Sequence, residues 1–235
     1  MTQGPVTDGG LTEVDLAAEI ERHRRGQVPA ELRRSHALLA ATALFLAHGY
    51  RATSMDDLAT RCGISKPVLY DLVGSKEQLF TDVMARAADE LADRVATAVD
   101  DEVDLTGKME AGALAFFEFI EERRDAWHTL LAPGAAPLGT EMDHLRARQV
   151  RQVARLLTTS ANPAGDPIDS IEAEMVAHAI TGASEALAAW WQLDCAAAGT
   201  TSGSRPSAES LASWVTTLLT PGLRALAAAD RPHPR

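Results

Sequence analysis

Three helix starts lie within residues 51–80, and this close spacing constrains the fold more than any other feature. The segment reads RATSMDDLATRCGISKPVLYDLVGSKEQLF. Thr53 or Ser54 can cap a first helix, Ser65 a second and Ser75 a third. A side-chain oxygen at such a position accepts a hydrogen bond from an early backbone N–H that has no partner within the helix. We therefore expect two short helices followed by a long one.

The two short helices have the residues that a steep crossing requires. Ala59 lets the second helix come close, Gly63 supplies the turn, and Ile64 closes it. The apolar side chains expected to face a shared core are Leu58, Leu69 and Leu72. A preceding helix over residues 30–48, stopped by Gly49, completes a three-helix unit. This pattern predicts a helix-turn-helix, whose second helix presents its first half to the major groove of DNA.

The start of that second helix carries groups that suit a DNA duplex. Lys66 can donate to a guanine or a phosphate, Val68 can touch a thymine methyl, and Tyr70 can donate to a phosphate. The predicted DNA-binding residues are Arg33, Thr53, Ser54, Ser65, Lys66, Pro67, Val68, Tyr70 and Lys76. Taken singly, each could be an ordinary helix cap or surface cation. Their gathering on one face favours DNA.

Residues 53–80 resemble the DNA-binding domain of TetR-family transcriptional regulators. The shared pattern is a small residue, a glycine turn, a short helix ending in Leu-Tyr, and Ser-Lys-Glu opening the next helix. The resemblance covers about residues 31–84, and it implies a homodimer with a C-terminal helical domain that binds a small molecule. Leu72 and Val73 stand where the family usually has a polar residue and an aromatic one. An alternative therefore stays open, a helical ligand-binding or interaction protein with weakened DNA recognition.

Charge is divided unevenly along the chain. Residues 28–80 hold six basic and five acidic residues, a net of +1, whereas residues 81–235 hold 13 basic and 23 acidic residues, a net of −10. Only the N-terminal segment can approach a polyanion, because like charges repel. Aromatic residues make up 5% of the chain and Ala, Leu, Glu and Arg dominate it, which favours helices nearly throughout.

The predicted fold class is all-α, with an N-terminal three-helix helix-turn-helix DNA-binding domain and a C-terminal helical bundle for ligand binding and dimerisation. The predicted domains are a mobile arm with a short helix at 1–27, the helix-turn-helix domain at 28–77, the ligand-binding and dimerisation domain at 78–230, and a tail at 231–235. Thr12, with Asp15 three residues later, is expected to cap the helix of the arm. Pro221 is expected to kink or break the end of the last helix, at 207–229.

Two sets of residues in the C-terminal region are candidates for binding. Aromatic, methionine and histidine side chains that could line an apolar pocket are Phe116, Phe117, Trp127, Met142, Met175, His178 and Trp190. Any one of them could instead fill a core. Small and apolar residues that could form a dimer interface are Ala179, Gly182, Ala186, Leu211, Trp214, Val215 and Leu218. These residues could also pack within their own subunit.

The sequence contains no motif for catalysis or metal binding. The patterns GxSxG, HExxH and GxGxxG and the phosphate loop are absent, and Cys62 and Cys195 lie far apart without a CxxC. Glu174 and His178 lie one helical turn apart, without further ligands. We expect no enzymatic activity, cofactor or metal, and we expect a cytoplasmic protein without membrane contact.

The predicted function follows from the helix-turn-helix and the helical C-terminal region. We expect a ligand-responsive, dimeric DNA-binding regulator that binds double-stranded operator DNA. It is expected to act as a repressor that a small hydrophobic or amphipathic effector releases from its operator. An effector with higher affinity for a DNA-incompetent arrangement lowers operator affinity by the same coupling free energy, typically ~1–3 kcal/mol.

Overall fold

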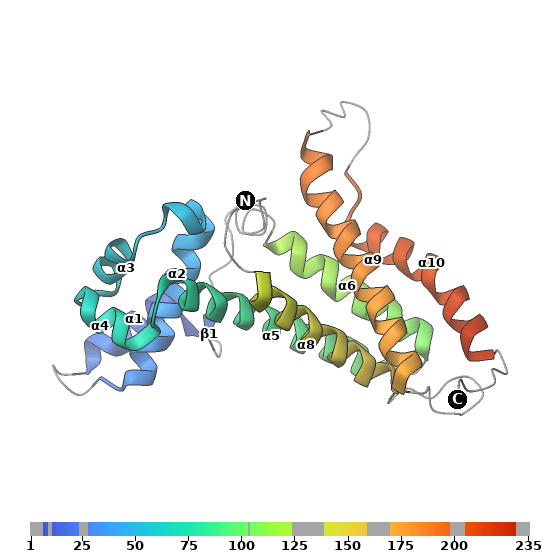
Figure 1. The fold of residues 1–235 in the computed structure, drawn as a ribbon, viewed down its shortest axis with the longest axis horizontal. Helices are drawn as coiled ribbons and strands as arrows, with labels where there is room; N and C mark the ends of the chain where they lie inside the picture. Colours follow the sequence, from blue (N-terminus) through green and yellow to red (C-terminus); the bar gives the residue numbers. More distant parts are fainter. Residues whose placement is uncertain are drawn as a thin grey trace. The chain divides into compact units, whose positions relative to one another are not determined.

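The computed structural model describes residues 7–8, 11–23, 28–102, 104–123, 139–158, 170–197 and 205–228, and these residues are largely helical, as the composition predicts (Figure 1). The helices are α1 (Glu13–Arg22), α2 (Ala30–Ala52), α3 (Met55–Cys62), α4 (Lys66–Val73), α5 (Lys76–Asp100), α6 (Leu105–Glu122), α8 (Gly139–Thr158), α9 (Ser170–Ala197) and α10 (Ala208–Ala228). Two short strands that the sequence did not indicate, β1 (Thr7–Asp8) and β2 (Leu11–Thr12), pair antiparallel.

The chain divides into two compact units, and the division falls within α5, between Ala87 and Ala88. The first unit contains α1 to α4 and the start of α5. The second contains the rest of α5 with α6, α9, α10 and most of α8. Leu79 and Phe80, near the start of α5, are completely buried. The core of the first unit therefore extends beyond residue 77, where the sequence analysis placed the domain boundary.

An aromatic cluster joins α2 to α5 in the first unit. The ring of Phe80 packs edge-on against Phe45, with centroids 5.2 Å apart, and against Tyr50, at 4.9 Å. Leu58 of α3 and Leu69 of α4 are also buried, at 1% and 0% exposure. Complete burial of such a side chain stabilises a fold by about 1.5–3 kcal/mol. The two short helices are thus held by their inward faces, as the leucine pattern predicts.

Local signals set the ends of the short helices. The Ser54 hydroxyl accepts from the Asp57 N–H at 3.0 Å and caps α3, and the Ser75 hydroxyl accepts from the Gln78 N–H at 3.2 Å at the start of α5. Gly63 ends α3 with φ at +65°, a left-handed conformation that glycine adopts without steric cost. The turn before α4 is therefore placed where the sequence predicts it.

The N-terminal helix α1 is attached to the helix-turn-helix. Its capping box is present as predicted, because the Thr12 hydroxyl accepts from the Asp15 N–H while the Asp15 carboxylate accepts from the Thr12 N–H. The Thr12 hydroxyl also donates to the Asp15 carboxylate at 2.7 Å, and this bond together with the one from the Thr12 N–H lowers the pKa of Asp15. Glu13 accepts two hydrogen bonds from Arg61 at the end of α3, at 2.7 and 2.9 Å. Leu16 of α1 is buried, at 2% exposure.

The second unit is a helical bundle, and two buried groups of side chains stand out among its described residues. One is formed by residues from α6, α8 and α9, namely Leu105, Met109, Val150, Leu157, Ala173 and Ala177. In the other, the Phe117 ring packs edge-on against Trp191, with centroids 6.2 Å apart. The indole N–H of Trp191 donates to the Pro206 carbonyl at 3.0 Å, which satisfies its buried donor. This bond ties α9 to the segment that leads into α10.

Pro221 does not break the last helix. Helix α10 continues through it to Ala228, so of the two expected outcomes the break is not found. Proline removes the hydrogen bond to the carbonyl four residues earlier, which is that of Thr217. Both Thr217 and Pro221 are exposed. Water can therefore solvate the released carbonyl, and the helix tolerates the proline.

Candidate DNA-binding face and ligand cavity

Helix α4 has one buried face and one exposed face. Leu69 and Val73 are almost completely buried, at 0% and 1% exposure, and they anchor the helix to the core. The predicted DNA-binding residues Ser65, Lys66 and Pro67 are exposed. Tyr70 is 43% exposed, and Val68 is half-buried. The first turn of α4 therefore presents polar and apolar groups together, as base and phosphate contacts require.

Lys66 makes an ion pair that the sequence analysis missed. Its ammonium donates to the Asp56 carboxylate at 2.9 Å, across the turn between α3 and α4. Both side chains are substantially exposed. The hydrogen bond to Asp56 raises the pKa of Lys66, so this lysine stays charged. Asp56 therefore competes with any phosphate or guanine for the same ammonium group.

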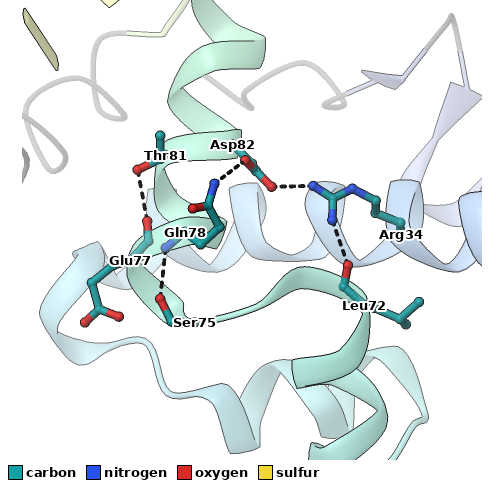
Figure 2. Close-up of polar contacts among 7 residues, drawn as sticks. All are labelled: Arg34, Leu72, Ser75, Glu77, Gln78, Thr81 and Asp82. Atoms are coloured by element: carbon teal, nitrogen blue, oxygen red, sulfur yellow. Dashed lines mark hydrogen bonds and ion pairs between the residues drawn. The ribbon is translucent and has the colours of Figure 1, made fainter. Parts of the chain in front are cut away.

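Arg34 of α2 connects the end of α4 to α5, as Figure 2 shows. Its Nη1 donates to the Leu72 carbonyl at 2.7 Å, and its Nη2 donates to the Asp82 carboxylate at 2.5 Å. Gln78 donates to the other oxygen of Asp82 at 3.0 Å. The last turn of a helix carries a partial negative charge, which a guanidinium stabilises. Arg34 is thus engaged within the subunit.

The hydroxyls of two predicted DNA-binding residues, Thr53 and Ser54, make hydrogen bonds within the subunit. The predicted DNA contact of Thr53 is corrected, because this residue is only 4% exposed. Its hydroxyl donates to the carbonyls of Leu44 and Gly49, at 3.2 and 2.9 Å. The Ser54 hydroxyl, besides capping α3, donates to the Asp57 carboxylate at 2.6 Å. Sequence patterns could not distinguish these two adjacent hydroxyls, since either can cap a helix.

Lys76 lies at the start of α5 against an aromatic ring. Its ammonium is 4.5 Å from the ring centroid of Tyr50, and it donates to the Arg51 carbonyl at 3.4 Å. The Tyr50 hydroxyl donates to Glu77 at 3.1 Å, and burial together with this carboxylate raises the pKa of Tyr50 to about 12. Lys76 is half-buried, as is Arg33 of α2. Both side chains are thus more enclosed than those at the start of α4.

The two residues that depart from the usual family pattern have structural roles. Val73 fills a core position, and the Leu72 carbonyl accepts from Arg34 while the Leu72 side chain is half-buried. An apolar residue at each position is compatible with these surroundings. The departure therefore leaves the exposed first turn of α4 intact.

The second unit contains an apolar cavity of about 100 Å³. Its lining residues come from α5 (Val95, Val99), α6 (Leu105, Lys108, Met109, Gly112, Ala113, Phe116), α8 (Gln149, Val153, Leu156, Leu157), α9 (Ile180, Thr181, Ser184) and α10 (Val215). A Cβ at Gly112 would lie 3.3 Å from a methyl carbon of Val99, so glycine allows α6 to approach α5 closely here. The few polar groups in the wall come mainly from α8 and α9.

The residues predicted for the pocket occupy different surroundings. Phe116 lines the cavity, whereas Phe117 is completely buried against Trp191 and is not part of the wall. Three others are exposed and absent from the wall, namely Met175, His178 and Trp190. Trp127 and the side chain of Met142 lie outside the described residues. Helical periodicity indicated apolar faces, but it could not tell which face a neighbouring helix covers.

The residues predicted for a dimer interface also divide into two groups. Leu211 and Val215 are buried within the subunit, at 4% exposure each. The exposed or half-exposed members are Ala179, Gly182, Ala186, Trp214 and Leu218. Trp214 is 70% exposed and Leu218 is 64% exposed, both on α10. Only the second group is open to contact with a partner subunit.

The described ranges have no feature of a metal site or a membrane span. They contain no group of three or more His, Cys, Asp or Glu side chains placed to hold an ion. Glu174 and His178 are both exposed on α9. No helix in these ranges is long and apolar enough to cross a bilayer.

Comparison with known proteins identifies both units. The family model for bacterial regulatory proteins of the tetR family matches residues 37–83, and the tetracyclin repressor-like C-terminal domain matches residues 105–220. The HTH-type transcriptional activator FasR of Mycolicibacterium smegmatis (strain ATCC 700084 / mc(2)155) is 32% identical over 174 residues, which cover 70% of this chain and 75% of that protein.

Solved structures show the same fold. A TetR-like transcriptional regulator from Rhodococcus sp. RHA1 is 27% identical, with a TM-score of 0.55 over 86% of this chain and 100% of that chain. FadR from Bacillus subtilis, in complex with stearoyl-CoA, is 13% identical, with a TM-score of 0.61 over 79% of this chain and 97% of that chain. With its helix-turn-helix matched at one end and its helical bundle at the other, the chain belongs to the TetR family and is a DNA-binding transcriptional regulator.

Proposed function

We propose that this regulator binds operator DNA as a homodimer and releases it when an acyl chain enters the cavity of the second unit. The observation that carries this proposal is the apolar cavity itself, since its wall is formed largely by aliphatic side chains. Stearoyl-CoA is the ligand in the structure of Bacillus subtilis FadR, which has this fold. Lys108 in the wall supplies a positive charge that suits an anionic head group.

The operator contacts in this proposal come from the exposed start of α4. Ser65, Lys66 and Tyr70 supply hydrogen bonds, and Pro67 and Val68 supply apolar contact. A second subunit, joined through the exposed faces of α9 and α10, supplies the second reading helix. A two-fold dimer of this kind selects an operator with two related half-sites.

Helix α5 supports a link between the two sites. It begins beside the Arg34 contact in the first unit, and its later turns contribute Val95 and Val99 to the cavity wall. A ligand that displaces this wall acts on the same continuous helix. The equilibrium shifts only to the extent that the ligand prefers the displaced arrangement.

The test measures DNA affinity with and without an acyl ligand. Labelled DNA from upstream of the protein's own gene is titrated with the full chain, and the titration is repeated with decanoyl-CoA, stearoyl-CoA or free coenzyme A. We expect the acyl thioesters, but not coenzyme A, to weaken binding by about 5- to 150-fold. Ala113→Phe, which fills the cavity, should bind DNA normally and resist release. The absence of sequence-specific binding would refute the operator role, and release by coenzyme A alone would refute the acyl ligand.

Activation of transcription is a second candidate, favoured by the relative at 32% identity, which is a transcriptional activator. A reporter under the upstream promoter separates the two outcomes. A repressor gives higher reporter output when its gene is deleted, whereas an activator gives lower output. Our proposal is repression, and lower output after deletion would replace it with activation.

A further inference from the structure

The second unit buries several hydroxyl groups that have no hydrogen-bond partner. Within the described residues, the hydroxyl oxygens of Thr181, Thr216 and Thr220 are in this condition. Their side chains are 4%, 7% and 6% exposed. Buried polar groups in folded proteins are nearly always paired, so each of these hydroxyls requires an explanation.

Threonine in a helix usually satisfies its own hydroxyl. Elsewhere in this chain, Thr42, Thr60 and Thr81 each donate to the carbonyl four residues earlier, at 2.8, 2.9 and 3.1 Å. This bond is the ordinary resting place of a helical threonine hydroxyl. Thr181 lies in α9 and does not make it. Its hydroxyl therefore remains available to a group from outside the helix.

Position distinguishes Thr181 from the other two threonines. Thr181 is part of the cavity wall, whereas Thr216 and Thr220 of α10 are not. Ala177, one turn before Thr181, packs in the cluster that contains Met109, and Gln192, three turns after it, donates to the Ile120 carbonyl at 3.3 Å. Thr181 therefore lies along α6 between the levels of Met109 and Ile120, within the apolar part of the wall.

We propose that the cavity takes a ligand whose apolar chain carries one neutral oxygen, a hydroxyl or a carbonyl, which hydrogen-bonds to Thr181. This inference rests on the proposed role of the cavity as the ligand site. The oxygen is neutral because the wall around Thr181 is apolar, and Lys108, the cation of the wall, precedes Met109 on α6 and so lies outside the stretch between Met109 and Ile120. A charged group beside Thr181 would lose its hydration without a counter-ion. Ser184, nearly one turn further along α9, adds a second hydroxyl to the wall.

The test uses small neutral probes that need no head group. Binding of heptan-4-one, heptan-4-ol and heptane to the full chain is followed by methyl NMR shifts of the cavity residues. Thr181→Val keeps the shape of the side chain and removes the hydroxyl. We expect this substitution to weaken the binding of heptan-4-one and heptan-4-ol by about fivefold and to leave the affinity for heptane unchanged. Thr181→Ser should retain the preference for the oxygenated probes.

Thr216→Val is the matched control, because it removes an equally buried, unpaired hydroxyl outside the wall. Both Thr216→Val and Thr181→Val should raise the melting temperature of the free protein. Thr216→Val should not change the affinity of any probe. Equal loss of ketone and heptane binding in Thr181→Val, or no loss of either, would overturn the inference. If acyl-CoA still releases DNA in that case, only the inference fails. If neither the probes nor acyl-CoA shift the methyl resonances of the cavity residues, both the inference and the proposed function fail.

Discussion

The guanidinium of Arg34 in α2 and the carboxylate of Asp82 in α5 lie 2.5 Å apart, and the same guanidinium holds the Leu72 carbonyl near the end of α4 (Figure 2). One side chain thereby connects α4 to α5, whose later turns contribute Val95 and Val99 to the cavity wall. A planar fork of donors can satisfy both acceptors at once. We infer that Arg34 sets the angle at which α4 is presented to DNA.

Replacing Arg34 with lysine should weaken operator binding. Lysine keeps the charge, but a single ammonium cannot reproduce the two-branched contact. The side chain is 44% exposed, so we expect a loss of stability of about 1 kcal/mol or less. Operator affinity, measured by fluorescence anisotropy, should fall about fivefold. Arg151→Lys is the control, since Arg151 is exposed on α8 in the second unit and is not among the predicted DNA-binding residues. Equal effects of the two substitutions would contradict a positioning role.

Replacing Asp56 with asparagine should strengthen DNA binding. The substitution releases the Lys66 ammonium from its ion pair and removes a negative charge near the duplex. We expect a gain of about two- to fivefold at low salt that shrinks as salt screens the interaction. Asp57→Asn removes the same charge but leaves the Lys66 ion pair in place, so its gain should be smaller. A gain of the same size in both variants would show that net charge alone is responsible.

Stability should depend on His36 in mildly acidic solution. Burial lowers the pKa of His36 below its usual 6.5, with Glu13 opposing and Arg61 adding to the shift. The unfolded chain therefore binds the proton more readily than the folded chain. Its contribution to stability is complete above about pH 6.5 and is lost as the pH falls from that value through the lowered pKa.

The measurement is the free energy of unfolding by urea between pH 5 and pH 7.5. His36→Leu should flatten the fall in stability below pH 6.5, whereas His48→Gln, at an exposed site, should leave it in place. Parallel pH profiles for wild type and His36→Leu would show that another group is responsible.

Placing a charge on the exposed face of α10 should separate the proposed dimer. Trp214 is 70% exposed in the single subunit, and aromatic residues of this kind often anchor interfaces. Light scattering should give twice the 25.1 kDa chain mass for the wild type and the single mass for Trp214→Glu. The monomer should also lose affinity for a two-half-site operator. Arg151→Glu, on the exposed face of α8, should remain dimeric. A wild type of 25.1 kDa would remove the dimer from the proposal.

Local chemistry alone determined where many helices begin and end. Thr12, Ser54 and Ser75 cap α1, α3 and α5 because an N-cap oxygen needs only the backbone of the next few residues. Gly63 ends α3 because glycine adopts positive φ at little cost. These signals are read within one turn of chain. For that reason the helix-turn-helix, and the exposed start of α4, followed from the sequence by itself.

Tertiary structure decided how the functional side chains are used. Whether Thr53 is exposed depends on which carbonyls surround it, and the partner of Lys66 depends on how α3 meets α4. Phe116 reaches the cavity while its neighbour Phe117 packs against Trp191. An amphipathic pattern tells which face of a helix is apolar. It does not tell what covers that face, because the covering side chains come from helices distant in the sequence.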